Sequence, residues 1–278
     1  MLVMLLVLLP ICIIGTNVTM CNDPNWMITF NDNFDVFNTS RWTVRNNMTH
    51  GPAEKQLYLA NNVNVENGNL IITTKKEIVQ SGRFNNTLYN YTSGWVDSKS
   101  KMFQKYGRFE VRAKLPSPSV GRDGKWPNAW PAHWLMPESE ICWPMGGEID
   151  IMEAYRPTPS GKGSMIMTYH WASKCGKDLY DGKNQLFPNK KNTTVIDWSN
   201  EYHTFGIEWS SKKIQWFVDG ILKHERVQGQ PKNLFIPSLQ FYMILNTAME
   251  PWSDYKVDKG LPCQHLIDRV TWCVPIND

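Results

Sequence analysis

The sequence predicts an all-β protein. Short runs rich in Val, Ile, Thr and aromatic residues recur along the chain, with turn signals between them. No segment of ten or more residues carries strong helical periodicity. The length of 278 residues suits one large sandwich or barrel domain, and these observations leave both architectures open.

The expected strands are spread over most of the chain. They are, in order, Trp26 to Phe30, Asn69 to Thr74, Arg108 to Leu115, Glu148 to Met152, Phe205 to Trp209, Ile214 to Val218 and Phe241 to Leu245. Asp219-Gly220 lies between two apolar runs and predicts a two-residue hairpin turn, which needs positive φ at both central residues. No repeat or linker marks a border, so we expect one domain over residues 22–278.

The N-terminal segment predicts export. It is nearly all apolar from Met1 to Gly15, which is typical of a signal peptide over residues 1–15. A retained membrane anchor is the alternative, but a spanning helix needs about 20 residues. We therefore expect a secreted, extracellular protein without a membrane partner. The sequons expected in such a glycoprotein begin at Asn17, Asn38, Asn47, Asn85, Asn90 and Asn192.

Charge and cysteine content narrow the possible partners. The net charge of +3 is spread without a Lys/Arg run, so nothing indicates a nucleic-acid partner. The 13 Trp residues offer faces for stacking on sugars, although core packing accounts for many of them. Removal of Cys12 with the signal leaves an odd number of cysteines, hence at most two disulfides and one thiol. No zinc-type spacing is present, so we expect no structural zinc site.

The segment Gly146 to Tyr155 carries three acids at strand spacing. Glu148 and Asp150 share one face of a strand, because side chains alternate. In an unbroken pleat Glu153 would point into the core, where an unpaired carboxylate costs several kcal/mol. We therefore predict a β-bulge near Ile151 or Met152 that returns Glu153 to the face of the other two acids.

Three acids on one face repel one another and take different protonation states. Glycosidic cleavage needs such a division, with a protonated acid for the leaving oxygen and an ionised carboxylate for the sugar carbon. The alternatives are solvated acids on an outer face, or ligands of a calcium ion. The flanking Gly146-Gly147 and the nearby tryptophans favour a catalytic site.

Glu148-Ile-Asp-Ile-Met-Glu153 resembles the active-site signature of glycoside hydrolase family 16. It has the extra residue before the last Glu that typifies the laminarinase-like β-1,3-glucanases of that family. The resemblance continues in order through Ser98 to Pro116, Trp126 to Pro137, Tyr169-His-Trp171, Phe205 to Trp209 and Met243 to Ala248. It covers nearly the whole mature chain.

The resemblance implies a β-jelly roll of two curved antiparallel sheets with a substrate cleft on the concave face. It also implies retaining endo-hydrolysis of internal β-1,3-glucosidic bonds in laminarin-type or mixed-linkage β-glucans. Glu148 would be the nucleophile, Glu153 the general acid and then base, and Asp150 the residue that tunes Glu148. The cleft-lining residues by resemblance are Trp130, Trp134, His170, Arg112 and Asn246.

We expect a monomer that needs no cofactor and no metal in its site, although a structural calcium ion on the convex side stays open, as in some relatives. The chain departs from the family pattern at Met249-Glu-Pro251, where members often carry Gly-Gly, and at Cys142 in the loop Pro137 to Met145. We hypothesise that Cys142 pairs with Cys175, which would tie this loop to the one after the His170 strand.

Two other functions compete with β-glucan hydrolysis. A non-catalytic β-1,3-glucan-binding protein on the same fold usually lacks the catalytic acids, which are all present here. A transglycosylase would form the same covalent intermediate and resolve it with a sugar hydroxyl instead of water. The sequence favours the hydrolase over the binding protein and does not exclude the transglycosylase.

Overall fold

The computed structural model describes residues 19–51, 54–116, 129–155, 164–179, 198–249 and 260–276. In these ranges the chain forms two β-sheets. The larger sheet contains β1 (Trp26–Asp32), β3 (Gln56–Tyr58), β4 (Val63–Glu66), β5 (Asn69–Ser81), β6 (Thr87–Ser93), β9 (Gly107–Lys114), β13 (His203–Trp209), β14 (Lys213–Val218), β15 (Ile221–Val227) and β17 (Cys263–Pro275). The smaller sheet contains β2 (Thr43–Val44), β7 (Trp95–Asp97), β8 (Phe103–Gln104), β10 (Ala129–Pro137), β11 (Glu148–Tyr155), β12 (Ser164–His170) and β16 (Phe241–Met249). Short 3-10 turns are η1 (Met20–Asn22), η2 (Ala60–Asn62) and η3 (Gly82–Phe84).

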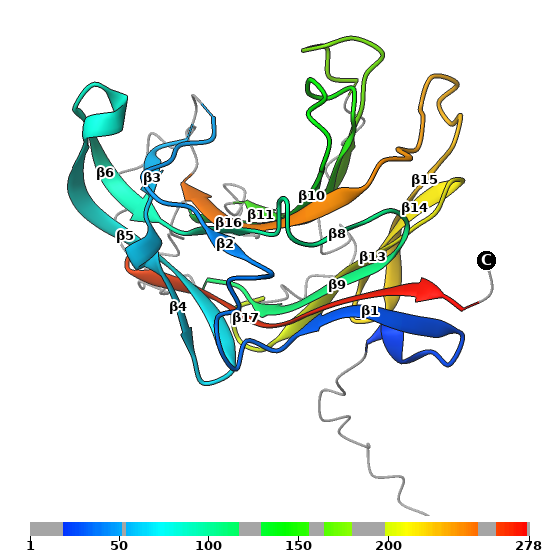
Figure 1. Ribbon diagram of the computed structural model, residues 1–278, viewed down its shortest axis with the longest axis horizontal. Coiled ribbons are helices and arrows are strands. Elements are labelled where there is room, and N and C mark those ends of the chain that lie inside the picture. The colour runs from blue at the N-terminus through cyan, green and yellow to red at the C-terminus, as the bar shows by residue number, and fades with distance from the viewer. Residues whose placement is uncertain are drawn as a thin grey trace, which may run out of the picture.

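The two sheets lie one above the other, as Figure 1 shows. The larger runs β15-β14-β13-β9-β17-β5-β6-β3, with β1 on β17 and β4 on β5, and the smaller runs β12-β11-β10-β16-β7-β2, with β8 on β16. All strand pairs are antiparallel except β3 with β6. The predicted sandwich of two antiparallel sheets is therefore confirmed, and the barrel alternative is wrong.

Every strand predicted from the sequence is present. The predicted hairpin also forms, since Asp219 and Gly220 join β14 to β15 with φ of 50° and 74°. The strand β10 was not predicted. Its prolines, Pro131 and Pro137, are residues that strands usually avoid.

The hydrophobic core fills the space between the sheets. Alternate residues of β9, Phe109, Val111 and Ala113, are fully buried there, which leaves Arg108 and Arg112 on the outer face. Several tryptophans also belong to the core, as expected: Trp42, Trp171, Trp209, Trp216 and Trp272. The core thus fixes which face of each strand is left for function.

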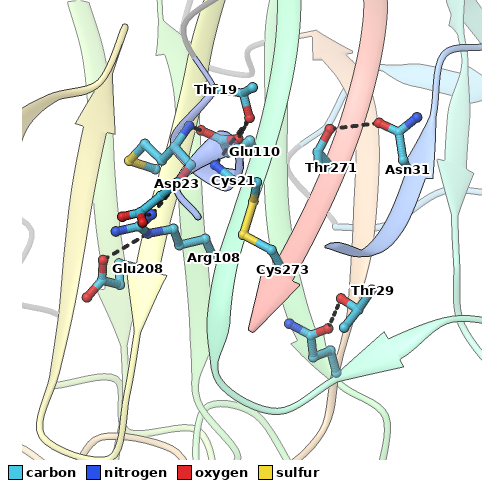
Figure 2. The surroundings of a disulfide bond; sticks show 12 residues. Thr19, Cys21, Asp23, Thr29, Asn31, Arg108, Glu110, Glu208, Thr271 and Cys273 are labelled. Atoms are coloured by element: carbon cyan, nitrogen blue, oxygen red, sulfur yellow. Dashed lines mark hydrogen bonds and ion pairs between the residues drawn. A yellow bond between two sulfur atoms is a disulfide. The ribbon is translucent and has the colours of Figure 1, made fainter. Parts of the chain in front are cut away.

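Two disulfides and one free thiol are present among the described cysteines. Cys142 is bonded to Cys175, as hypothesised, and Cys21 is bonded to Cys273 across 252 residues. Cys263 is the buried free cysteine, so the predicted leftover thiol is confirmed. Figure 2 shows that the N-terminal turn is attached by the Cys21 disulfide to the outer face of the larger sheet.

The expected signal peptide, residues 1–15, lies outside the described residues, as do Asn17 and Asn192. Asn85 and Asn90 are exposed, and Asn38 and Asn47 are partly exposed, so all four are on the surface. Among the described residues, none of the helices has the length and apolar character needed to cross a bilayer. A single domain over residues 22–278 stays a prediction.

Candidate active site

The three predicted acids lie on β11, which is paired with β10 on one side and β12 on the other. On β12, Asp150 is opposite Thr168 and Glu153 is opposite Ile166, so β11 has one residue more than its partner. The register with β10 shifts at the same place. The predicted bulge is confirmed, and it lies at Ile151 and Met152.

The bulge corrects the phase of the strand. Ile151 and Met152 are both fully buried in the core, so two successive side chains point inward. Glu153 consequently returns to the face that carries Glu148 and Asp150, which we call the acidic face. The Trp216 indole N–H, from β14 of the opposite sheet, donates to the backbone oxygen of Asp150 at 2.8 Å and supports the backbone beside the bulge.

Indole N–H groups hold the two outer acids. Trp143, in the loop between β10 and β11, donates to Glu148 Oε2 at 2.6 Å. Trp130, on β10, donates to Glu153 Oε1 at 3.1 Å. These two hydrogen bonds fix the orientation of the outer carboxyl groups.

His170 lies beside the central acid. Its Nε2 is 3.2 Å from Asp150 Oδ2 and 4.0 Å from Glu148 Oε1. Its Nδ1 is 2.7 Å from Asp178 Oδ2. The predicted site residue His170 therefore contacts the acids directly.

The acids have perturbed proton affinities. Burial raises the pKa of Glu148 well above its ordinary value, and the charge of Asp150 adds to the rise. Burial also raises the pKa of Asp150 to about 8, although a hydrogen bond with Glu148 acts in the opposite direction. Glu148 and Asp150 therefore titrate as a coupled pair in which the protonated forms are favoured. The predicted division between a protonated general acid, Glu153, and an ionised nucleophile, Glu148, stays a prediction.

Trp134 and Asn246 lie on neighbouring strands of the smaller sheet, where Trp134 is paired with Asp150 of β11 and Asn246 of β16 is paired with Ala132 of β10. The Trp134 indole donates to Asn246 Oδ1 at 2.8 Å, and Asn246 Nδ2 donates to Tyr58 Oη at 3.0 Å. Trp134 is packed edge-on against Trp95. Both predicted residues are on the expected face but are almost fully buried, so they build its floor.

The acidic face continues beyond Trp95 into a cavity of about 580 Å³. Arg45, Asp97 and Tyr242 contribute to its walls. Arg45 forms a two-pronged contact with Asp97, at 2.5 and 2.7 Å. The face thus extends along the sheet away from the acids.

The prediction that Arg112 lies on the cleft side is wrong. Arg112 is on β9 of the larger sheet and faces outward, with its Nη1 2.8 Å from Asp268 Oδ2. Its guanidinium also lies 4.8 Å from the centre of the Tyr202 ring. β9 belongs to the larger sheet, whereas the three acids lie on β11 of the smaller sheet. The prediction failed because a local motif does not show which sheet its strand joins.

Two residues of the site were missed in the sequence. Trp143 precedes Pro144 and the Gly-Gly pair close to Glu148, so a signal was available. Asp178 lies in a loop after β12, and no local pattern distinguishes it from other acids. Both reach the site through loops of the smaller sheet.

Comparison with known proteins agrees with this geometry. The family model described as "Beta-porphyranase A-D, GH16 domain" matches residues 26–265. The chain belongs to glycoside hydrolase family 16. The laminarinase catalytic domain of Thermotoga maritima MSB8 has a similar fold, with a TM-score of 0.74 and 29% identity over 91% of this chain and 100% of that one.

Two curated relatives of this family 16 chain are named as glucanases. The glucan endo-1,3-beta-glucosidase of Cryptopygus antarcticus is 30% identical over 81% of this chain and 80% of its own length. Glucan endo-1,3-beta-glucosidase A1 of Niallia circulans is 32% identical over 72% of this chain. This chain spans only 28% of the Niallia circulans protein.

Proposed function

We propose that this family 16 domain is a retaining endo-β-1,3-glucanase. The observation that carries the proposal is the bulge of β11, which brings Glu148, Asp150 and Glu153 onto one face under two indole N–H donors. A retaining glycosidase needs two carboxyl groups on opposite sides of one glycosidic bond, at short separation. Glu148 and Glu153 flank Asp150 on the same strand and supply them.

In the proposed mechanism, Glu153 gives its proton to the glycosidic oxygen while Glu148 attacks the anomeric carbon. The leaving sugar departs, and the glycosyl group is held as an ester on Glu148. Glu148 must be ionised when it attacks, and in this mechanism its proton passes to the neighbouring Asp150, whose pKa is raised to about 8. Glu153 then takes a proton from water, which cleaves the ester and returns both acids to their starting states.

A β-1,3-glucan is the substrate that the named relatives favour. The family model is named instead for a porphyranase, which makes porphyran the informative second substrate. The length of the acidic face and the cavity beyond Trp95 give room for several sugar units, which supports cleavage within a chain. A mixed-linkage β-glucan tests the finer specificity.

The remaining properties of the protein are proposals too. The apolar N-terminus and the sequons support secretion as a glycoprotein. We expect a monomer and a reaction that needs no cofactor. Chelation with EDTA is therefore expected to leave cleavage unchanged, while a fall in Tm on chelation would support a structural calcium ion.

The test compares laminarin-type glucan, mixed-linkage glucan and porphyran as substrates of the purified protein and of Glu148→Gln. Release of new reducing ends from the glucans, with a loss of more than about 10³-fold in the variant, is the expected result. Cleavage of porphyran, with neither glucan cleaved, would indicate that the substrate is a galactan instead of a glucan. Retention on a glucan column without any cleavage would support a binding protein instead.

A further inference from the structure

The loop after β12 places the carboxylate of Asp178 beside the Nδ1 atom of His170. Asp178 Oδ2 lies 2.7 Å from His170 Nδ1, while Nε2 of the same ring lies 3.2 Å from Asp150 Oδ2. Asp178, His170 and Asp150 therefore form a series of contacts that ends beside the proposed nucleophile, since His170 Nε2 is also 4.0 Å from Glu148 Oε1. His170 and Asp178 are 17% and 23% exposed, so the contact is largely shielded from water.

This loop is fastened to the loop that holds Trp143. The Cys142–Cys175 disulfide joins the two, and Gly176 N–H donates to the Trp143 backbone oxygen at 2.9 Å. The two loops rise from the same side of the smaller sheet in Figure 1. One covalent link thus steadies both the Trp143 contact with Glu148 and the Asp178 contact with His170.

We propose that Asp178 is a positioning residue for the reaction, and that the Cys142–Cys175 disulfide holds it in place. The inference rests on the proposed function of the acidic face. A carboxylate that accepts a hydrogen bond from Nδ1–H fixes the tautomer and the orientation of an imidazole. Nε2 of His170 then faces Asp150 in every turnover.

The charge of Asp178 supports the same role. It raises the pKa of Asp150, after the larger effect of burial. Among the described residues, the titratable groups found within 4.0 Å of the His170 ring nitrogens include Glu148 and Asp150 from β11 and Asp178 from the loop after β12. Asp178 thereby favours the protonated form of Asp150, the form that leaves Glu148 ionised in the proposed mechanism.

Asp178→Asn keeps the shape of the side chain and removes its charge. We expect kcat on β-1,3-glucan to fall about 10- to 100-fold, with KM within about twofold, as for other residues that orient a reacting group. The kcat profile should move to lower pH, because loss of a negative charge lowers the pKa of neighbouring acids. Asp178→Glu, which keeps the charge, should retain the position of the profile.

Glu140→Gln is the matched control, because Glu140 is an exposed carboxylate on the other clamped loop and its partner is Lys99. Its kcat and pH profile should equal those of the unaltered protein. An Asp178→Asn protein with unchanged kcat and unchanged pH profile would overturn the proposal. A fall in Tm large enough to explain the whole loss of kcat would also overturn the proposal.

The second arm compares the two disulfides. Cys142→Ser with Cys175→Ser should copy the kcat loss of Asp178→Asn. Cys21→Ser with Cys273→Ser removes a disulfide on the opposite side of the molecule, and should lower Tm while kcat is unchanged. Equal effects of both pairs on kcat would contradict a specific clamp.

Nitrogen-15 NMR of the His170 ring separates this proposal from the proposed function. Nδ1 should carry the proton in the unaltered protein, and the Nδ1 signal should shift in Asp178→Asn. Absence of cleavage by the unaltered protein would refute the glucanase, whereas an unmoved His170 signal would refute the positioning role alone.

Discussion

The outer face of the larger sheet and the region of the smaller sheet around β11 hold their acids in different ways. On the larger sheet, acids meet cations: Arg108 Nε lies 3.0 Å from Glu208, and Arg112 Nη1 lies 2.8 Å from Asp268. On the smaller sheet, Glu148 and its neighbouring acids meet indole N–H groups and one histidine instead. Matched charges stabilise the outer face of the larger sheet, whereas the buried acids Glu148 and Asp150 have raised pKa values, as is common in active sites.

The outer face of the larger sheet is also where the N-terminal turn is attached. Figure 2 shows the Cys21–Cys273 disulfide beside Glu110 and Arg108. Met20 N–H donates to Glu110 Oε1 at 2.7 Å, and Arg108 Nη1 donates to the Met20 backbone oxygen at 2.6 Å. These contacts attach the N-terminal turn to β9 and β17 of the larger sheet, on the side of the molecule away from the acidic face. We therefore expect substitutions on the two faces to separate stability from activity.

The largest expected effect is the loss of the general acid. Glu153→Gln should lower kcat/KM on β-1,3-glucan by about 10²- to 10⁴-fold. Formation of the glycosyl-enzyme from an aryl β-glucoside with a good leaving group should be far less affected, because that group departs without a proton. Glu148→Gln should lose both reactions. Equal losses of Glu153→Gln on both substrates would refute the assigned role.

The next effect concerns the N–H donor at the nucleophile. Trp143→Phe keeps an aromatic ring and removes the hydrogen bond to Glu148, so we expect kcat to fall about 10- to 100-fold, as for a hydrogen bond to a charged group. Trp26→Phe is the matched control. Trp26 is packed against Arg108 on the other sheet, and its variant should keep full activity. Similar losses in both variants would contradict the comparison of the two faces.

A pH-dependent stability effect should follow from Asp150. Its folded-state pKa of about 8 exceeds the ordinary 3.8, so the folded protein holds a proton that the unfolded chain releases. This contribution to stability is fully present below about pH 4 and is lost as pH rises toward 8. Asp150→Asn should therefore raise Tm more at pH 8 than at pH 4. Thermal melts of the variant and the unaltered protein at the two pH values measure this difference.

The exposed Asp35 provides the control for that experiment. Asp35→Asn should change Tm by a similar small amount at both pH values. If Asp150→Asn behaved in the same way, the raised pKa of Asp150 would be refuted.

The smallest effect is expected at the mispredicted residue. Arg112→Met should leave kcat/KM on β-1,3-glucan within about twofold and change the free energy of unfolding by about 1 kcal/mol or less, because its partly exposed pair with Asp268 is screened by solvent. Denaturant melts and reducing-end assays measure the two quantities. A large loss of activity would show that the outer face takes part in the reaction.

The sequence predicted what depends on local alternation. The bulge could be derived from three acids, the period of a strand and the cost of burying Glu153. The strands and the hairpin at Asp219 followed from equally local patterns. The Cys142–Cys175 pairing was also anticipated.

The site predictions that were wrong or missing depend on contacts between segments that are distant in the sequence. The alternation around Arg112 shows that it shares a face with Arg108, but it does not show which sheet β9 joins. Asp178 contacts His170 from a loop that the Cys142–Cys175 disulfide links to another loop. No sequence pattern around Asp178 predicts that contact. Trp143 was within reach, since it lies five residues before Glu148 on the same approach to the strand.

The central claim is that Glu148 forms a covalent glycosyl-enzyme while Glu153 serves as acid and then base. The most direct measurement is proton NMR of the anomeric signals during the first minutes of β-1,3-glucan hydrolysis, before mutarotation. The account predicts that the β-anomer is released first, because two successive inversions retain the configuration. Initial release of the α-anomer would mean a single inversion by water, and would contradict the role assigned to Glu148.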